Sequence, residues 1–157
     1  MPTCPVIGLK HLALSGTLMV VALSPHLAHA ALGEPESTVA TDVQQLKASI
    51  KSTQLTNYRV HEMQLPSGTV LREFAVPGGN VFAVTWKGPS IPNLRQALGR
   101  YFDMYVSAAK ISHTGHNHLQ IQQNDFAMQS SGHMRAFTGR AYLPQALPSG
   151  TSLEDLR

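Results

Sequence analysis

Short β-prone runs separated by tight turn segments occupy the middle of this sequence and constrain its fold most. The runs cover residues 58–65, 69–76 and 81–86, and the turns between them are Pro66-Ser67-Gly68 and Pro77-Gly78-Gly79-Asn80. Turns this short join antiparallel strands, since a parallel connection needs a dozen residues or more. The sequence therefore predicts an antiparallel meander.

Three more β-prone runs follow in the last third of the sequence. They cover residues 119–123, 126–130 and 134–143, and Asn124-Asp125 and Ser131-Gly132 supply the turns between them. Because Asn, Asp, Ser and Gly favour turn conformations, this part of the chain predicts a second antiparallel meander. The two meanders together predict six strands.

A segment with helical periodicity precedes each meander. Residues 94–105 carry a continuous apolar stripe, interrupted by Gly99, whose cost of about 1 kcal/mol relative to alanine we expect close packing to offset. Residues 38–52 carry a narrower stripe at helical spacing, formed by Val43, Leu46 and Ile50. The predicted fold class is therefore α+β, with two helices packed on one face of an antiparallel six-stranded sheet.

The order of these elements is αβββ followed by αβββ, which suggests an internal duplication. Gly79-x-Val81-x-Ala83-Val84-Thr85 is similar to Gly132-x-Met134-x-Ala136-Phe137-Thr138, which lies 53 residues further along. This similarity predicts a tandem αβββ repeat. Two unrelated meanders that use the same turn chemistry are the alternative.

The first 30 residues have the parts of a secretory signal peptide. Lys10 precedes an apolar run over residues 12–23, and Ala28-His29-Ala30 supplies a small-x-small cleavage site. A run of this length spans about 18 Å as a helix, short of the roughly 30 Å hydrocarbon core, which disfavours a retained membrane anchor. We expect cleavage after Ala30 and a mature protein in the periplasm or outside the cell, with no membrane span.

Loss of the signal peptide changes what the composition implies. The formal net charge falls from +3 to +2 when Lys10 is removed, and no basic cluster remains, so we expect no nucleic-acid partner. Cys4, the single cysteine, is removed as well, which excludes disulfides and cysteine metal sites. For the mature chain we expect a flexible lead-in over residues 31–40, one α+β domain over 41–145 and a C-terminal tail over 146–157.

Several stretches of the mature chain share their residues with one bacterial protein family. They are Val70-Leu71-Arg72-Glu73-Phe74, the segment 79–89, Pro92-x-Leu94, Leu98-Gly99-x-Tyr101-Phe102, the segment 132–144 and Leu147-Pro148-x-Gly150. In these stretches the chain resembles the exported Gram-negative proteins catalogued as domain of unknown function 2844. Asn93 departs from the aspartate expected in that family, which affects at most a helix cap. The resemblance implies a signal peptide and a shared domain, and it implies no activity or catalytic residues.

Three closely spaced histidines form the pattern most typical of a metal site, His113-x-x-His116-x-His118. Imidazole nitrogens at this spacing around the flexible Gly115 suit Zn²⁺ or Cu²⁺. A solvent-exposed connector is the alternative, because polar loops rich in histidine also occur without metal.

Arginines within the predicted strands are the second unusual feature. Arg72 and Arg135 each share a strand face with apolar residues, where a charge needs a partner. The functional interpretation is a sheet surface that binds an anion or another protein, with the candidate residues Arg72, Arg135, Arg140, Trp86 and Tyr142. The structural alternative is a set of cross-strand ion pairs, in which Glu62 or Glu73 is the partner of Arg72.

No complete motif for nucleophilic catalysis occurs in the sequence. No serine lies in a Gly-x-Ser-x-Gly elbow, and Gly78-Gly79 precedes a strand rather than the helix that a phosphate-binding loop requires. We therefore expect a non-enzymatic exported module that binds an envelope protein or another envelope component. A divalent-metal-binding protein that uses the histidine loop is the alternative.

Overall fold

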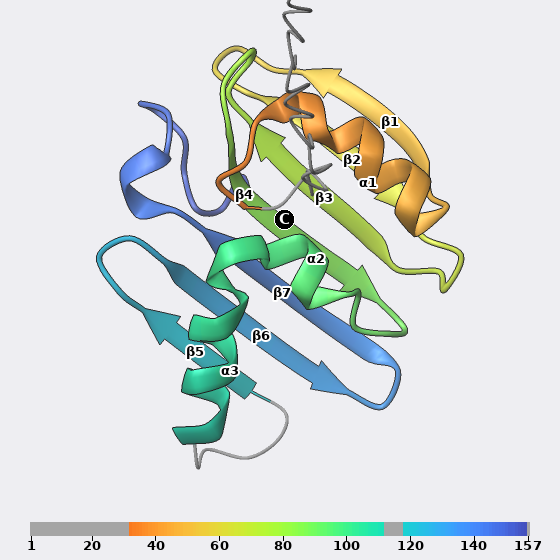
Figure 1. The fold of residues 1–157 in the computed structure, drawn as a ribbon, viewed down its shortest axis with the longest axis vertical. Coiled ribbons are helices and arrows are strands. Elements are labelled where there is room, and N and C mark those ends of the chain that lie inside the picture. Colours follow the sequence, from red (N-terminus) through yellow and green to blue (C-terminus); the bar gives the residue numbers. More distant parts are fainter. Residues whose placement is uncertain (1–31, 112–117, 157) are drawn as a thin grey trace, which may run out of the picture.

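The computed structural model describes residues 32–111 and 118–156. Within these ranges seven strands form one antiparallel sheet in the order β1-β2-β3-β4-β7-β6-β5, and helices cover one of its faces (Figure 1). The predicted antiparallel α+β fold is confirmed, with one strand more than expected. The strands are β1 Ser49–Gln54, β2 Arg59–Gln64, β3 Val70–Ala75, β4 Val81–Gly88, β5 His118–Gln122, β6 Ala127–His133 and β7 Ala136–Tyr142.

The two predicted meanders form the two halves of this sheet. Strands β1 to β4 follow one another in chain order, whereas β5 to β7 run in the reverse order from the opposite edge. The halves meet where β4 pairs with β7, and Trp86 and Gly139 are directly opposed in this pair. The last strand of each meander therefore lies at the centre of the sheet.

The additional strand is β1, in a segment for which the sequence predicted helix. Helix α1 spans Val39–Leu46 and ends at Lys47, which has the left-handed φ of 50°. The following residues pair with β2 as an edge strand, on which Ile50 is 43% exposed. The predicted helix over 38–52 is therefore wrong beyond Leu46, because Ser, Ile and Thr fit an exposed edge strand and the spacing of Ile50 is coincidental.

The second predicted helix consists of three shorter elements. They are α2 Leu94–Leu98, the 3₁₀ turn η2 Gly99–Tyr101 and α3 Phe102–Ile111. Gly99 has φ 50° and ψ −122°, a conformation that glycine adopts without steric cost. The role of Gly99 is therefore to bend the chain between α2 and α3, and the prediction of one continuous helix over 94–105 was wrong.

The segment before α1 is bound to the sheet. Leu32 is completely buried and donates its backbone N–H to the Ala97 carbonyl, and Gly33 donates to the Val81 carbonyl. The 3₁₀ turn η1 Glu36–Thr38 then leads directly into α1. The described part of the expected lead-in over 31–40 thus belongs to the folded body, and its buried Leu32 and backbone hydrogen bonds explain why.

The C-terminal segment packs against the sheet face that the helices leave uncovered. After the 3₁₀ turn η3 Pro144–Ala146, the chain places Leu147, Leu153 and Leu156 on an apolar cluster around Phe74 and Tyr142. Leu156 is only 3% exposed. The described part of the expected tail over 146–157 is therefore part of the second core of the molecule.

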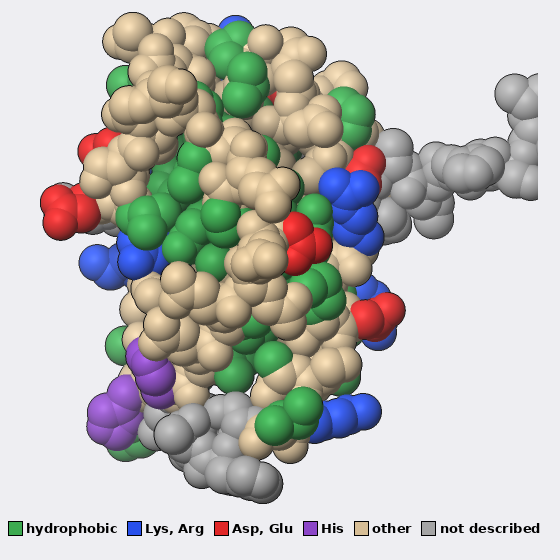
Figure 2. Space-filling view, turned by 90° about the vertical axis from the view of Figure 1, so that its left-hand side faces the viewer, with side chains coloured by type: hydrophobic (Ala, Val, Ile, Leu, Met, Phe, Trp, Pro, Cys, Tyr) green, Lys and Arg blue, Asp and Glu red, His purple; other side chains and the backbone are tan. Residues whose placement is uncertain are grey.

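The main core lies between the sheet and the helices. Trp86, Met63, Leu71 and Met128 are almost completely buried there, with Leu98 of α2 packed against them. Figure 2 shows one side of the molecule, on which apolar side chains gather in the middle and charged side chains of both signs lie mostly toward the rims. The helices pack on one face of the sheet, and the C-terminal segment packs on part of the other.

Candidate functional site

A row of polar side chains crosses the sheet on the face opposite the helices. Arg72 of β3 lies opposite Thr85 of β4, Thr85 lies opposite Arg140 of β7, and Arg140 lies opposite Gln129 of β6. Their chain neighbours point into the helix-side core, and side chains alternate along a strand, so this row points to the other face. Since adjacent strands are about 4.8 Å apart, the backbones of Arg72 and Arg140 are separated by about 10 Å.

A second polar row runs beside the first, closer to the end of β4 and the start of β7. Lys87 lies opposite Thr138, Thr138 lies opposite Ser131, and Ser131 lies opposite His118. The C-terminal segment covers the apolar end of this face, at the level of Tyr142, and its Leu156 reaches the edge of the polar rows. Thr85 is only 4% exposed, whereas Arg72 and the residues of the second row are at least partly exposed. Together the two rows line a depression of about 400 Å³, which we call the open-face hollow.

The open-face hollow is cationic. Arg72, Lys87 and Arg140 line it together with several hydroxyl groups, and none of its described lining residues is an aspartate or a glutamate. Guanidinium, ammonium and hydroxyl groups all donate hydrogen bonds to anions. The hollow is therefore suited to an anionic ligand.

Arg72 is held by an ion pair at one end of the hollow. Its Nε atom donates to Oε2 of Glu62 at 2.7 Å, and both side chains are partly exposed. Glu62 is thus the partner, and the alternative partner Glu73 faces the helix-side core. Because Nε accounts for one of the five N–H donors of the guanidinium, the other nitrogen atoms can still bind a ligand. An exposed pair of this kind contributes about 1 kcal/mol or less.

Arg140 is held by uncharged acceptors at the centre of the hollow. Its Nε and Nη2 atoms donate to Oε1 of Gln129 at 3.1 and 2.8 Å, and Nη1 donates to the Leu153 carbonyl at 2.7 Å. Neutral acceptors fix the plane of a guanidinium but leave its positive charge in place. Arg140 is therefore an oriented cation, which lowers the entropic cost of binding an anion.

The side chains of the other candidate residues of the sheet lie elsewhere. Trp86 is buried in the helix-side core, and Tyr142 is covered by the C-terminal segment. Arg135 has φ 68° in the turn between β6 and β7 and lines a separate depression beside Phe137. The structure thus brings Arg72 and Arg140 together and separates them from Arg135 and Tyr142. Trp86 also lines the hollow, but this residue is only 2% exposed.

Sequence reasoning missed Lys87, Thr85 and Gln129 as members of this site. Thr85 and Gln129 lie opposite an arginine across the sheet, and Lys87 lies two residues beyond Thr85 on the same strand. This depends on the pairing of β4 with β7, which lie in different meanders, and a single sequence does not reveal the register of such a pair. The alternation of each strand is the signal that could have placed Lys87 and Thr85 on the same face as Arg72.

The histidine motif is only partly described. His113 and His116 lie outside the described residues, and His118 is the exposed first residue of β5, where it lines the open-face hollow. In the described part of the chain, no three His, Cys, Asp or Glu side chains form a group that could hold a metal ion. The proposed binding of Zn²⁺ or Cu²⁺ stays a prediction.

Fold and site together define a small α+β sheet protein with one helix-covered face and one partly open, cationic face. A family model described as a protein of unknown function, DUF2844, matches residues 28–156, and the chain therefore belongs to this family, as its sequence motifs predicted. Searches of the curated proteins and of the solved structures gave no match. Among the described residues, no helix has the length and apolar character needed to cross a membrane.

Proposed function

We propose that this protein is an exported binding module whose open sheet face binds an acidic segment of an envelope protein. The observation that supports this most is the convergence of Arg72, Lys87 and Arg140 in one hollow with no acidic lining residue among those described. Arginine binds carboxylates through paired, charge-assisted hydrogen bonds, and such bonds are about twice as strong as neutral ones.

The dimensions of the hollow favour an extended ligand. Apart from Leu156, its lining residues come from five adjacent strands, β3, β4, β7, β6 and β5. At about 4.8 Å between neighbouring strands, these give the hollow a length of about 19 Å. An extended peptide presents every second side chain on one side, about 7 Å apart. Two or three carboxylates of an acidic segment can therefore contact the cations at the same time, which a single small anion cannot do.

Fluorescence anisotropy tests this proposal. The probe is a fluorescein-labelled peptide of eight residues that alternate Glu and Ser, and the reference peptide has Gln in place of Glu. We expect saturable binding of the Glu peptide at pH 7, at least tenfold weaker binding to an Arg72→Gln/Arg140→Gln variant, and weaker binding at higher salt.

A control variant separates the site from the overall charge. Lys47 and Lys110 are exposed residues of the helix-covered side, and Lys47→Gln/Lys110→Gln removes the same two positive charges. This variant is expected to bind the Glu peptide as the unaltered protein does. Equal loss in both double variants, or equal binding of the Glu and Gln peptides, would contradict the proposal.

Export is a second part of the proposal. The signal peptide is expected to be cleaved after Ala30, and in support of this Leu32, two residues further along, is already buried in the folded body. Mass spectrometry of the protein recovered from the periplasm and medium of a Gram-negative host tests it. We expect a mature chain that begins at Ala31, and recovery of a chain that retains residues 1–30 would overturn the assignment.

We also propose that the two halves of the chain are a tandem αβββ repeat. The sequence offset of 53 residues carries Trp86 onto Gly139, its own partner at the centre of the β4–β7 pair. The same offset carries most of β4 onto β7 and most of α1 onto α2. Experimental coordinates in which the rotation that superposes β4 on β7 also brings α1 onto α2 would support the repeat. A rotation that leaves these helices apart would contradict it.

A further inference from the structure

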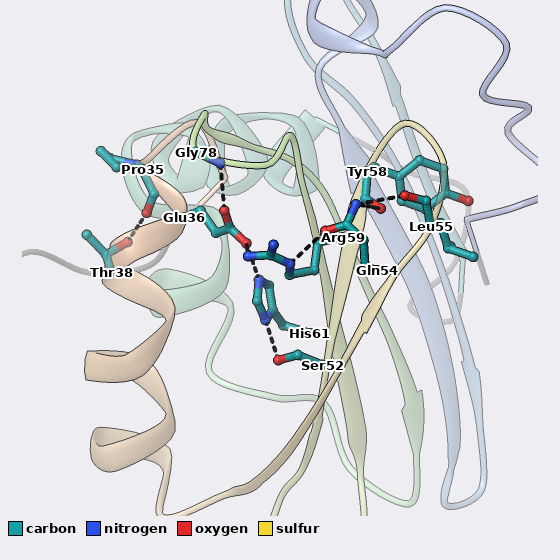
Figure 3. A network of polar contacts seen from close by, with 10 residues as sticks. All are labelled: Pro35, Glu36, Thr38, Ser52, Gln54, Leu55, Tyr58, Arg59, His61 and Gly78. Atoms are coloured by element: carbon teal, nitrogen blue, oxygen red, sulfur yellow. Dashed lines mark hydrogen bonds and ion pairs between the residues drawn. The ribbon is translucent and has the colours of Figure 1, made fainter.

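A second polar cluster lies on the helix-covered side of the sheet, between η1 and the first two strands (Figure 3). Ser52 of β1 and His61 of β2 are directly opposed, and Oγ of Ser52 lies 2.8 Å from Nδ1 of His61. On the other side of the ring, Nε2 of His61 lies 2.9 Å from Oε1 of Glu36. Three side chains from η1, β1 and β2 thus form one continuous hydrogen-bonded series.

Glu36 is held as a carboxylate by several donors. Its Oε1 atom accepts from Nη1 of Arg59 at 2.7 Å, and Oε2 accepts from the backbone N–H of Gly78 at 2.9 Å. Burial acts to raise the pKa of Glu36, but the hydrogen bonds from Gly78 and His61 and the charge of Arg59 outweigh it and lower this pKa. Glu36 is therefore anionic at neutral pH.

The carboxylate determines the tautomer of His61. An anionic oxygen only accepts hydrogen bonds, so the neutral ring places its N–H at Nε2, toward Glu36. Nδ1 is then the acceptor, and the hydroxyl of Ser52 donates to it. In this arrangement His61 is positioned to remove the proton of Ser52, which is the relation between base and nucleophile in serine hydrolases.

A depression of about 620 Å³ opens beside Ser52 and His61. One wall is apolar and comes from Val39 and Val43 of α1 with Ile50 of β1, while Arg59 lines the polar side. A small ester therefore has both an apolar surface for its acyl chain and a cation for its carbonyl oxygen. Ser52 itself is solvent-exposed, so a substrate can reach its hydroxyl.

We propose that Ser52, His61 and Glu36 form an acyl-transfer site that hydrolyses small carboxylic esters. Ser52 Oγ attacks the carbonyl carbon while its proton passes to Nδ1 of His61, and Arg59 stabilises the negative charge on the carbonyl oxygen. The bond to the alcohol breaks as the alcohol oxygen takes the proton from His61, which leaves an acyl group on Ser52. Glu36 orients the imidazole and stabilises its charged form.

Water completes the cycle without any further reactant. It attacks the acyl carbon as its proton passes to His61, and this proton returns to Ser52 Oγ as the acyl–oxygen bond breaks. The products are one carboxylic acid and one alcohol, with the protein unchanged. This activity goes beyond the proposed binding function and uses the other face of the sheet, so either proposal can fail alone.

Hydrolysis of p-nitrophenyl acetate and p-nitrophenyl butyrate by the purified protein tests the proposal. We expect a rate above that of buffer, at least a 100-fold lower kcat/KM in Ser52→Ala, and a comparable loss in His61→Gln. The butyrate ester is expected to show the lower KM because of the apolar wall. Ser49→Ala changes another exposed serine of β1 and is expected to keep the full rate.

Covalent labelling gives a readout that does not depend on turnover. A fluorophosphonate probe is expected to add one label per chain, on the peptide that contains Ser52, and His61→Gln is expected to slow this labelling. Because Ser52 is exposed on an edge strand, Ser52→Ala is expected to unfold at the same temperature as the unaltered protein. Absence of both hydrolysis and labelling, or retention of the rate in Ser52→Ala, would overturn the proposal.

Discussion

Gly139 of β7 lies directly opposite Trp86 of β4, and the indole occupies the space that a side chain at position 139 would need. A Cβ atom added to Gly139 would overlap the six-membered ring of Trp86, which is itself only 2% exposed. The close approach of this pair allows the two halves of the sheet to pack a large aromatic residue at their junction.

Gly139→Ala is therefore expected to destabilise the fold by about 1–3 kcal/mol, because an overpacked core must move the indole. Urea unfolding measures this change in the free energy of unfolding. The same substitution in a Trp86→Phe background is expected to cost less, since the smaller ring leaves room for the methyl group. An equal loss of unfolding free energy in the two backgrounds would show that the contact between position 139 and Trp86 does not cause the destabilisation.

Glu73 gives the protein an unusual dependence of stability on pH. Its side chain is completely buried, and in the described structure neither carboxylate oxygen has a hydrogen-bond partner. Burial, and then the negative charge of Asp42, raises the pKa of Glu73 well above its ordinary value of 4.5. In the unfolded chain this carboxyl ionises above about pH 4.5, whereas in the folded protein it remains protonated.

The contribution of Glu73 to stability is therefore complete below pH 4.5 and decreases as the pH rises from there toward the raised pKa. Glu73→Gln keeps the shape of the side chain and removes its titration, so the variant is expected to lose less stability between pH 5 and pH 8. Urea unfolding at these two pH values tests this expectation. Parallel changes in the variant and the unaltered protein would contradict it.

Glu36 is expected to have the opposite effect. Its lowered pKa means that its contribution is present above about pH 4.5 and is lost as the pH falls through the folded-state pKa. Glu36→Gln weakens the hydrogen bonds to Arg59, His61 and Gly78, and we expect a loss of about 2 kcal/mol at pH 7. The difference between variant and unaltered protein is expected to shrink at pH 3, and a constant difference would argue against this role of Glu36.

Leu156 tests whether the C-terminal segment belongs to the fold. Its side chain packs on the apolar cluster around Phe74 and Phe82 and is almost fully buried. We expect Leu156→Ala to lower the free energy of unfolding by about 2–3 kcal/mol, as large-to-small core substitutions do. A change below about 0.5 kcal/mol, the usual effect of a surface substitution, would mean that the segment detaches easily.

Turn chemistry in the sequence was enough to predict most of the sheet. Pro66-Ser67-Gly68 and Asn124-Asp125 both fall between strands, as their residue types predicted. The predicted turn at Ser131-Gly132 was wrong, because these residues belong to β6 and the chain turns at Met134 and Arg135, which have positive φ. Strand β1 was missed because all six of its residues are exposed and its sequence shows no alternation of apolar and polar residues. Its single apolar residue, Ile50, continued the helical spacing of the preceding segment. The bend at Gly99 was missed because an apolar stripe continues through it.

The candidate site could be predicted only in part for a similar reason. Alternation along single strands identified Arg72 as an unusual charge on a sheet face, but it could not show that Arg140 lies two strands away on the same face. Trp86 was grouped with these arginines by its chemical type, although its position in β4 points it into the core. The Ser52–His61 pair was hidden because Ser52 lies in the strand that the sequence did not reveal.

Titration of the isotopically labelled protein with the Glu-Ser peptide, followed by NMR chemical shifts, tests the central proposal most directly. We expect the largest chemical-shift changes at the open-face hollow, in particular at Thr85, Lys87 and Arg140, together with Gln129 and Thr138. The residues of α1 and α2 are expected to change little. Shifts confined to the helix-covered side, or no shifts at millimolar peptide, would contradict the assignment of the open face as the binding surface.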